Sequence, residues 1–404
     1  MALFRQVPPT SLLLYPAISI ALILPTCQSV EQDLQMRDFS SHLEPQTQQK
    51  AYALHADTYV DPQFLELEKP SIFNNHWQLV GHINQLSEVG DQITARIGNV
   101  PIVVVKNSDN QLKALHNVCR HRAGPLAMKN CNSNVLRCKY HGWTYDLDGV
   151  LKSAPEMQTT QHFNIRDIQL PQAYLETWQN LIFVSINKPS FSLEKYFAGI
   201  TEQIKPIDLR LMKFSHRDQY VIDCNWKVYM DNYLEGYHLP HVHPGLNKLL
   251  DYRQYDLELH KWYSYQFSPL DNAKNSNADI FYGEGSAHYY CIFPNLMLNI
   301  LPGRLQTNLI LPEGHNRTKI IFDSYYSEIE SEKTLKLIQE DRAFSDEVQQ
   351  EDITICEQVQ VGLNSGSYQA GPLCMKRERG VLHFQNLVRQ TINEYGIYMK
   401  KNNV

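Results

Sequence analysis

The sequence predicts an α+β protein in which a small all-β domain precedes a larger α+β domain. Short β-rich runs, broken by turn residues, fill the region from Asp91 to about Ile186. After Pro189, helical segments alternate with strand-like runs. Because the pattern changes near residue 188, we expect one domain over residues 49–188, with a leading helical segment, and a second domain over residues 189–404.

Each expected element follows from local composition. Apolar and β-branched runs predict the strands, and Asp148-Gly149 is typical of a hairpin turn. A helix is expected from Asn225 to about Leu239, where Pro240 would end it, and a long helix is expected over 331–363. The expected strands are 100–106, 112–118, 135–138 and 181–186 in the first domain, and 289–301, 307–311 and 320–326 in the second.

The composition excludes several classes of protein. The chain has 404 residues, of which 43% are hydrophobic and 20% are charged, so it can bury full cores and is not mainly disordered. Its 37 basic and 43 acidic residues give a net charge of −6, which argues against a nucleic-acid partner. Eight cysteines are too few for a disulfide scaffold in a chain of this length.

The first candidate metal site lies in the β domain. The segment C-R-H at 119–121 is followed, after 16 residues, by C-K-Y-H at 138–141. Two cysteines can hold one iron of a [2Fe–2S] cluster and two histidines the other. Zinc also accepts two cysteines and two histidines, but its usual motifs pair like ligands, so the mixed halves favour the cluster. The expected cluster ligands are Cys119, His121, Cys138 and His141.

Two longer segments around these ligands carry a family resemblance. CRHRAG at 119–124 and CKYHGWTY at 138–145 resemble the cluster loops of Rieske non-haem iron oxygenase large (alpha) subunits. The resemblance implies a Rieske β-sandwich followed by an α+β helix-grip catalytic domain with an antiparallel sheet. It also implies two cofactors, a Rieske-type [2Fe–2S] cluster and one mononuclear Fe(II) per chain.

The second candidate metal site lies in residues 225–244, NWKVYMDNYLEGYHLPHVHP. A helix would place Asp231, Glu235 and His238 on one face, and Pro240 would then let the chain turn His243 back toward His238. Two histidines and a carboxylate with open positions are the ligand set of non-haem Fe(II) enzymes that activate O₂. His241 competes with His243. The segment is similar to the family's mononuclear-iron motif, in which four residues separate the histidines, and this favours His243.

The third iron ligand must come from another part of the chain. On a helical projection Asp352 falls within an apolar stripe, where a carboxylate is costly unless it is paired or bound to metal. A carboxylate paired with a basic residue remains the alternative. The resemblance of residues 351–357 to the family's C-terminal ligand helix also favours Asp352. The acids considered are Asp346, Glu347, Glu351, Asp352 and Glu357.

Glu235 stands three residues before His238. By resemblance it is a bridging carboxylate that links His141 of one chain to His238 of the next, and a carboxylate so placed would orient the imidazole. The alternative is a surface residue at an interface. Many ring-hydroxylating members carry Asp at this position, whereas NYLEGYH is similar to members that oxidise carnitine, glycine betaine or choline.

We therefore expect the oxygenase component of a two-part enzyme. It would use O₂ and electrons from an NAD(P)H-dependent reductase or ferredoxin to oxidise a small quaternary ammonium substrate, by hydroxylation or N-demethylation. The chain has no dinucleotide-binding G-x-G-x-x-G after a strand, so a partner must bind NAD(P)H. The alternatives are an aromatic ring-hydroxylating alpha subunit and a Rieske electron carrier without catalysis. The family pattern implies a ring-like homo-oligomer, often a trimer.

Residues 1–48 form an N-terminal extension. Its apolar run at 11–24 is short for a membrane span and contains Pro16, so either a signal peptide or a start placed upstream of Met36 accounts for it. We favour the start at Met36 and a cytoplasmic protein, because the predicted redox chemistry is of a cytosolic kind.

Overall fold

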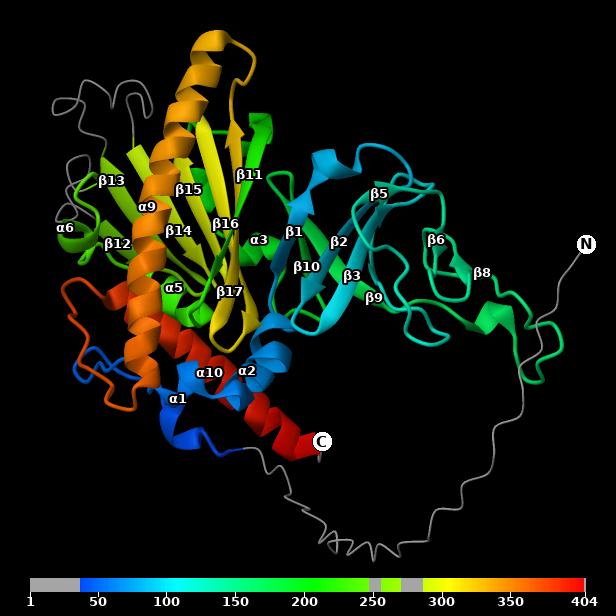
Figure 1. The fold of residues 1–404 in the computed structure, drawn as a ribbon, viewed down its shortest axis with the longest axis horizontal. Coiled ribbons are helices and arrows are strands. Elements are labelled where there is room, and N and C mark those ends of the chain that lie inside the picture. Colours follow the sequence, from blue (N-terminus) through cyan, green and yellow to red (C-terminus); the bar gives the residue numbers. More distant parts are fainter. Residues whose placement is uncertain (1–36, 247–255, 270–285, 403–404) are drawn as a thin grey trace, which may run out of the picture. The chain divides into compact units, whose positions relative to one another are not determined.

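A computed structural model describes residues 37–246, 256–269 and 286–402 (Figure 1). The apolar run at 11–24, the alternative start at Met36 and most of the expected extension lie outside these residues. Within the described ranges, no helix is both long enough and apolar enough to cross a bilayer.

The first sheet has seven strands in the order β1-β10-β9-β4-β3-β2-β5, and all its pairs are antiparallel. Strand β3 (Val100–Lys106) has the predicted bounds, and its residues 102–105 are all buried. Burial on both faces explains why this run is apolar without alternation. The other strands are β1 (Gln78–His82), β2 (Asp91–Ile97), β4 (Leu112–His116), β5 (Cys131–Asn132), β9 (Gln172–Trp178) and β10 (Leu181–Ser185).

A small second sheet carries the predicted hairpin turn. Its order is β6 (Leu136–Arg137), β7 (Thr144–Tyr145) and β8 (Leu151–Ser153). Gly149 has φ +85°, a conformation that glycine adopts without strain, and its N–H donates to the Asp146 carbonyl at 3.1 Å. This geometry confirms the turn at Asp148-Gly149.

The third sheet has seven strands in the order β11-β17-β16-β15-β14-β13-β12 and is also antiparallel. The single strand predicted over 289–301 is wrong, because Phe293-Pro294-Asn295 separates two paired strands, and proline cannot donate to a ladder. The strands are β11 (Lys213–Ile222), β12 (Asp256–Leu259), β13 (Tyr263–Pro269), β14 (Ser286–Ile292), β15 (Leu296–Leu301), β16 (Arg304–Gly314) and β17 (Arg317–Tyr326).

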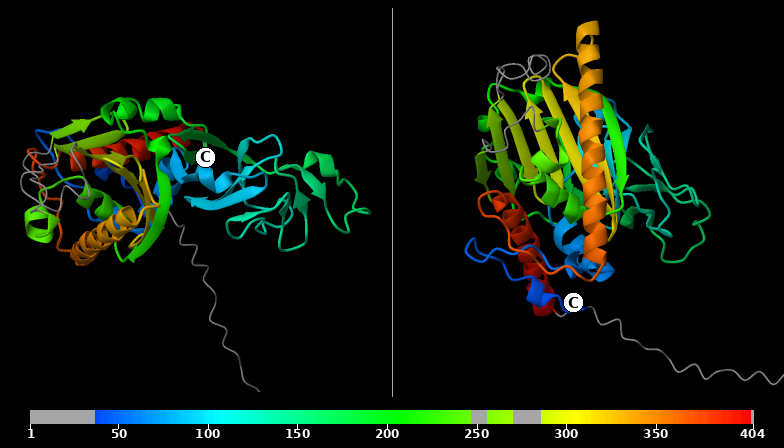
Figure 2. Two further views of the ribbon diagram at one scale, coloured as in Figure 1. Left: turned by 90° about the horizontal axis from the view of Figure 1, so that it is seen from above. Right: turned by 60° about the vertical axis from the view of Figure 1, so that its left-hand side comes forward.

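The long helix α9 (Glu332–Asn364) confirms the prediction for 331–363 and lies along one face of the third sheet (Figures 1 and 2). Helix α10 (Arg379–Asn402) was not predicted, although Val381, Phe384, Val388 and Ile392 recur at helical spacing and are buried. The remaining helices are α1 (Asp57–Val60), α2 (Pro62–Glu68), α3 (Leu193–Tyr196), α4 (Ile200–Gln203), α5 (Trp226–Tyr233), α6 (Leu239–Val242) and short turns at Ser40–His42, Lys69–Phe73, Ile83–Leu86, Ile165–Asp167 and Leu209–Leu211.

The leading helical segment packs against α5. Phe64 and Trp226 belong to one buried apolar cluster, and Lys227 Nζ lies 2.5 Å from Glu68 Oε1 with both side chains 0% exposed. The α+β class and the antiparallel catalytic sheet are confirmed.

Candidate metal centres

Two tight loops bring the four expected cluster ligands together. Cys119 and His121 follow β4, and each loop is closed by a backbone bond from its cysteine: Cys119 N–H donates to Gly124 O at 2.9 Å, and Cys138 N–H donates to Trp143 O at 2.8 Å. Both thiols are buried, whereas His121 and His141 are exposed. This arrangement places the thiol pair inside the protein and the imidazole pair at its surface.

The ring geometry suits two metal-binding imidazoles. The planes of His121 and His141 cross at 68° with centroids 4.7 Å apart, and Trp143 stacks on His121 at 4.8 Å. A metal must lie close to the plane of each ring that binds it, and two crossed planes share a line on which one metal satisfies both rings. Desolvation, followed by the nearby His121 and Arg122, lowers the pKa of His141 and favours the neutral ring that metal binding needs.

The space beside the thiols fits a bound group. A Cβ atom on Gly124 would lie 2.8 Å from Cys138 Sγ, so only glycine is accommodated there. Tyr145 OH lies 3.3 Å from Cys119 Sγ and accepts the Arg120 N–H at 3.0 Å. Burial raises the pKa of the Cys119 thiol, so a thiolate at this position needs a bound cation.

The second site is built differently from the prediction. Helix α5 ends at Tyr233, so Glu235 and His238 lie beyond it and do not share a helical face with Asp231. Asp231 instead accepts a bond from Tyr59 OH at 2.7 Å and another from Gln385 at 3.0 Å. A second short helix, α6, begins after His238 and ends before His243.

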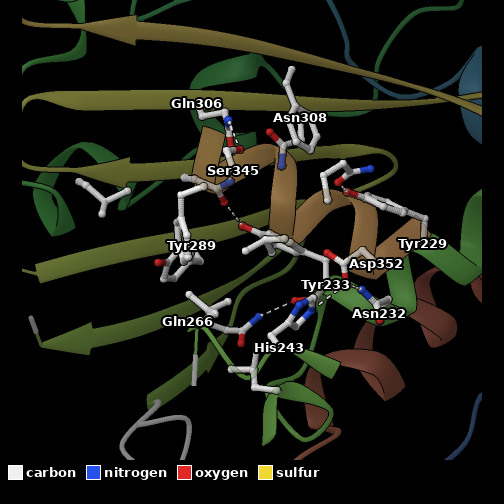
Figure 3. Close-up of a pocket in the computed structure, with 18 of the residues that line it drawn as sticks. Tyr229, Asn232, Tyr233, His243, Gln266, Tyr289, Gln306, Asn308, Ser345 and Asp352 are labelled. Carbon is white, nitrogen blue, oxygen red and sulfur yellow. Dashed lines mark hydrogen bonds and ion pairs between the residues drawn. The ribbon is translucent and has the colours of Figure 1, made fainter. Parts of the chain in front are cut away.

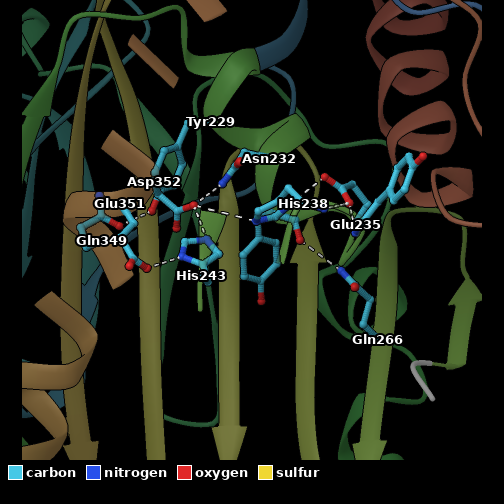
Figure 4. A network of polar contacts seen from close by, with 11 residues as sticks. Tyr229, Asn232, Glu235, His238, His243, Gln266, Gln349, Glu351 and Asp352 are labelled. Carbon is cyan, nitrogen blue, oxygen red and sulfur yellow. Dashed lines mark hydrogen bonds and ion pairs between the residues drawn. The ribbon is translucent and has the colours of Figure 1, made fainter. Parts of the chain in front are cut away.

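Helix α9 supplies the carboxylate that meets the two histidines (Figure 4). Asp352 Oδ1 lies 3.0 Å from His243 Nε2 and 4.0 Å from His238 Nε2. The three ligand atoms lie within 4.8 Å of one another, and the ring planes cross at 70°. His241 is exposed and does not belong to this group.

A carboxylate holds the outer nitrogen of each imidazole. Glu235 Oε1 lies 2.7 Å from His238 Nδ1, and Glu351 Oε2 lies 2.7 Å from His243 Nδ1. Burial lowers the pKa of His243, but Asp352 and Glu351 together raise it above its ordinary value. Such bonds fix the ring orientation and tautomer.

The contact of Glu351 corrects the helical projection. That projection singled out Asp352 because of its apolar neighbours on the helix, yet Glu351 also reaches His243. Of the apolar residues that follow Asp352 on α9, Ile355 and Val359 are exposed, whereas Cys356 is buried. Asn232 was also missed, and its Nδ2 donates to Asp352 Oδ1 at 2.6 Å. Glu351 and Asp352 are adjacent and lie about 100° apart around the helix, yet both reach His243, so the helical projection did not reveal this second contact.

A cavity of about 180 Å³ opens beside the three convergent residues (Figure 3). Its walls come from α5, α9 and the third sheet. Tyr233, Tyr289 and Phe344 supply aromatic faces. Among the described lining residues, the charged carboxylates Glu235, Asp341 and Asp352 outnumber the one basic side chain, Arg304.

Models of two protein families match separate parts of the chain. Residues 76–166 match the Rieske [2Fe-2S] domain, and residues 209–394 match the ring hydroxylating alpha subunit (catalytic domain). The chain is 33% identical to chloroplastic choline monooxygenase of Arabidopsis thaliana over 83% of this chain and 81% of that protein. It is 28% identical to the carnitine monooxygenase oxygenase subunit of Escherichia coli (strain K12), over 86% and 95%.

Solved structures show the same fold. The quaternary ammonium Rieske monooxygenase CntA in complex with L-carnitine superposes with a TM-score of 0.74 at 25% identity, covering 86% of this chain and 99% of CntA. A naphthalene 1,2-dioxygenase with indole in its active site superposes with a TM-score of 0.68 at 16% identity, over 84% and 92%. The second match is informative about the fold alone.

Proposed function

Because this chain belongs to the Rieske oxygenases with a ring-hydroxylating catalytic domain, we propose that it oxidises a small quaternary ammonium compound with O₂ and electrons from a separate reductase or ferredoxin. It is an oxidoreductase that carries a Rieske [2Fe–2S] cluster and a mononuclear iron. We place the boundary between the two domains near residue 188.

We assign the cluster to Cys119, His121, Cys138 and His141, and the mononuclear iron to His238, His243 and Asp352. The buried thiols, the exposed crossed rings and the convergence of the second group within 4.8 Å support this assignment. When bound, the cluster passes single electrons and the mononuclear iron activates O₂. In this arrangement Glu235 and Glu351 hold the protons of the outer imidazole nitrogens and keep the rings in place.

The cavity beside the iron ligands is the main observation that supports the proposed class of substrate. Its volume suits a small molecule, being below the range of about 300–1,000 Å³ that drug-sized ligands occupy. A quaternary ammonium group carries no N–H, so it is held by aromatic faces and by negative charge. Tyr233, Tyr289 and Phe344 provide the aromatic faces. The similarity to choline and carnitine monooxygenases supports the same substrate class.

Electron transfer between subunits is part of the proposal. Within one chain, Glu235 has no hydrogen bond to a cluster histidine among the described residues, whereas His141 is exposed. We therefore propose a trimer in which Glu235 of one chain meets His141 of the next. We also propose a cytoplasmic location, because the redox chemistry is of a cytosolic kind.

The test is substrate-dependent O₂ uptake. The protein, loaded with both metals and supplied with NADH and a compatible reductase, is offered a panel of quaternary ammonium compounds and a matched panel of arenes. We expect uptake to rise with the ammonium compounds only. Uptake with the arenes alone would replace this proposal by aromatic ring hydroxylation, and no uptake with either panel would leave an electron carrier.

A further inference from the structure

A ladder of polar pairs joins strand β16 to helix α9 along one wall of the cavity. Arg304 Nε lies 2.9 Å from Asp341 Oδ2, and Gln306 Nε2 donates to Ser345 Oγ at 3.2 Å. Each step is two residues on the strand, about 6.6 Å, and four on the helix, about 6 Å. Because the two steps are similar in length, Asn308 and Gln349 follow as the next pair of residues along the ladder.

The third rung of the ladder, the pair Asn308 and Gln349, has polar atoms without hydrogen-bond partners among the described residues. Asn308 and Gln349 are 4% and 2% exposed, and both line the cavity. Among the described residues, Asn308 Oδ1 and Gln349 Nε2 have no hydrogen-bond partner. Figure 3 shows Asn308 on the same strand face as Gln306, and Figure 4 shows Gln349 on α9 near Asp352. A buried acceptor and a buried donor therefore border one cavity, each lacking a partner.

The orientation of the Gln349 amide is set by a neighbour. Tyr229 OH donates to Gln349 Oε1 at 2.6 Å, so the amide nitrogen is the atom left for a ligand. An unpaired buried polar atom costs free energy that a suitable ligand group recovers on binding. The rung offers one acceptor and one donor, and a hydroxyl group matches both, since it donates one bond and accepts another.

We propose that Asn308 and Gln349 bind a hydroxyl group of the substrate, which is a hydroxyalkyl trimethylammonium compound. This inference rests on the proposed function and narrows it. The substrate hydroxyl donates to Asn308 Oδ1 and accepts from Gln349 Nε2. A carboxylate only accepts, so it leaves Asn308 Oδ1 facing another acceptor.

Two further observations agree with a substrate whose end opposite the ammonium group is neutral and carries a hydroxyl. Gln349 precedes Asp352 by three residues, about 4.5 Å along the helix, so the hydroxyl end lies within one turn of the iron ligands. Arg304, the one Arg or Lys among the described lining residues, is already paired with Asp341. A zwitterion that ends in a carboxylate would therefore have to compete with Asp341 for its basic partner.

The test compares two cations that differ by one oxygen. Isothermal titration of the metal-loaded protein without O₂ measures the dissociation constants of choline and of ethyltrimethylammonium, which lacks the hydroxyl. We expect choline to bind about tenfold more tightly, as one recovered pair of hydrogen bonds implies. Equal affinities would mean that water alone fills the rung and would overturn the inference while leaving the proposed function in place. If neither cation binds, the function and the inference fall together.

Two variants test whether the preference for choline arises at Asn308 and Gln349. Asn308→Leu and Gln349→Met keep the side-chain size and should reduce the tenfold preference to about twofold or less, mainly by weakening choline. Gln306→Met is the matched control, because it removes an amide that already has a partner, and it should preserve the preference. A preference that survives Asn308→Leu would overturn the assignment. The wild-type comparison decides the hydroxyl preference even if a variant does not fold.

Discussion

Glu351 offers the sharpest test of how the mononuclear site is organised. Its carboxylate lies 2.7 Å from Nδ1 of His243, a ring that is only 1% exposed. We expect Glu351→Leu to weaken binding of the mononuclear iron while leaving the cluster intact. The physical reason is that the ring loses the acceptor that fixes its tautomer and direction.

The magnitude follows from the kind of bond. Hydrogen bonds to charged groups contribute about 1.5–3 kcal/mol, which corresponds to roughly 10–150-fold in a binding constant. Because the Glu351 side chain is 28% exposed, water screens part of its interaction with His243, and the lower half of the range applies. We expect about a tenfold to thirtyfold loss for Glu351→Leu. Glu351→Gln should fall between this variant and the wild type, because its amide oxygen still accepts a neutral bond.

The assay is competition for ferrous iron with a chromophoric chelator under anaerobic conditions. The visible absorption of the cluster reports cluster content in the same sample and serves as the internal reference. Glu347→Gln is the matched control, because it removes a carboxylate one turn earlier on the same helix from an exposed position. If Glu351→Leu held iron as tightly as Glu347→Gln, the positioning role of Glu351 would be refuted.

The other predictions concern charge and stability. Lys227→Met should lower the free energy of unfolding, measured by urea denaturation, by about 3–5 kcal/mol, because it leaves the buried Glu68 carboxylate without its partner. Adding Glu68→Gln should restore most of the lost stability, and a double variant as unstable as Lys227→Met would contradict this account. Burial raises the pKa of Asp231 to about 7, above an unfolded value near 3.9, so the folded state binds the extra proton and stability falls as pH rises from about 4 to 7. Asp231→Asn should flatten that fall in unfolding curves measured at pH 5 and pH 8, and an unchanged slope would count against it. Glu235→Gln should retain both metals in iron analysis yet slow single-turnover electron transfer to the mononuclear iron, and turnover at the wild-type rate would remove the proposed bridge between subunits.

The cluster ligands, strand β3 and helix α9 were predicted from the spacing of residues that are close together in the sequence. The C-x-H and C-x-x-H segments each sit within one turn, so short-range geometry places a thiol and an imidazole together whatever the rest of the chain does. The β3 run and the α9 helix were predicted because their side-chain patterns depend on neighbours a few residues away. The same reasoning could have found α10, whose buried residues recur at helical spacing.

Other features were decided only when distant segments packed. Asp231 has the right spacing to join Glu235 and His238, but α5 ends at Tyr233, and Asp231 is bonded to Tyr59, which lies 172 residues earlier. Likewise, Glu351 and Asp352 are adjacent in sequence, and their separate contacts with the two nitrogens of His243 depend on how α9 crosses α6.

The sequence by itself determined the chemistry that the chain can support, because the types of ligand and the short spacings between them lie within short segments of the sequence. The tertiary structure alone decided which carboxylate meets which nitrogen, and which buried amides of β16 and α9 border the cavity without partners. Those outcomes depend on contacts across more than a hundred residues or between a strand and a helix, and such distances are set by packing, which local composition does not specify.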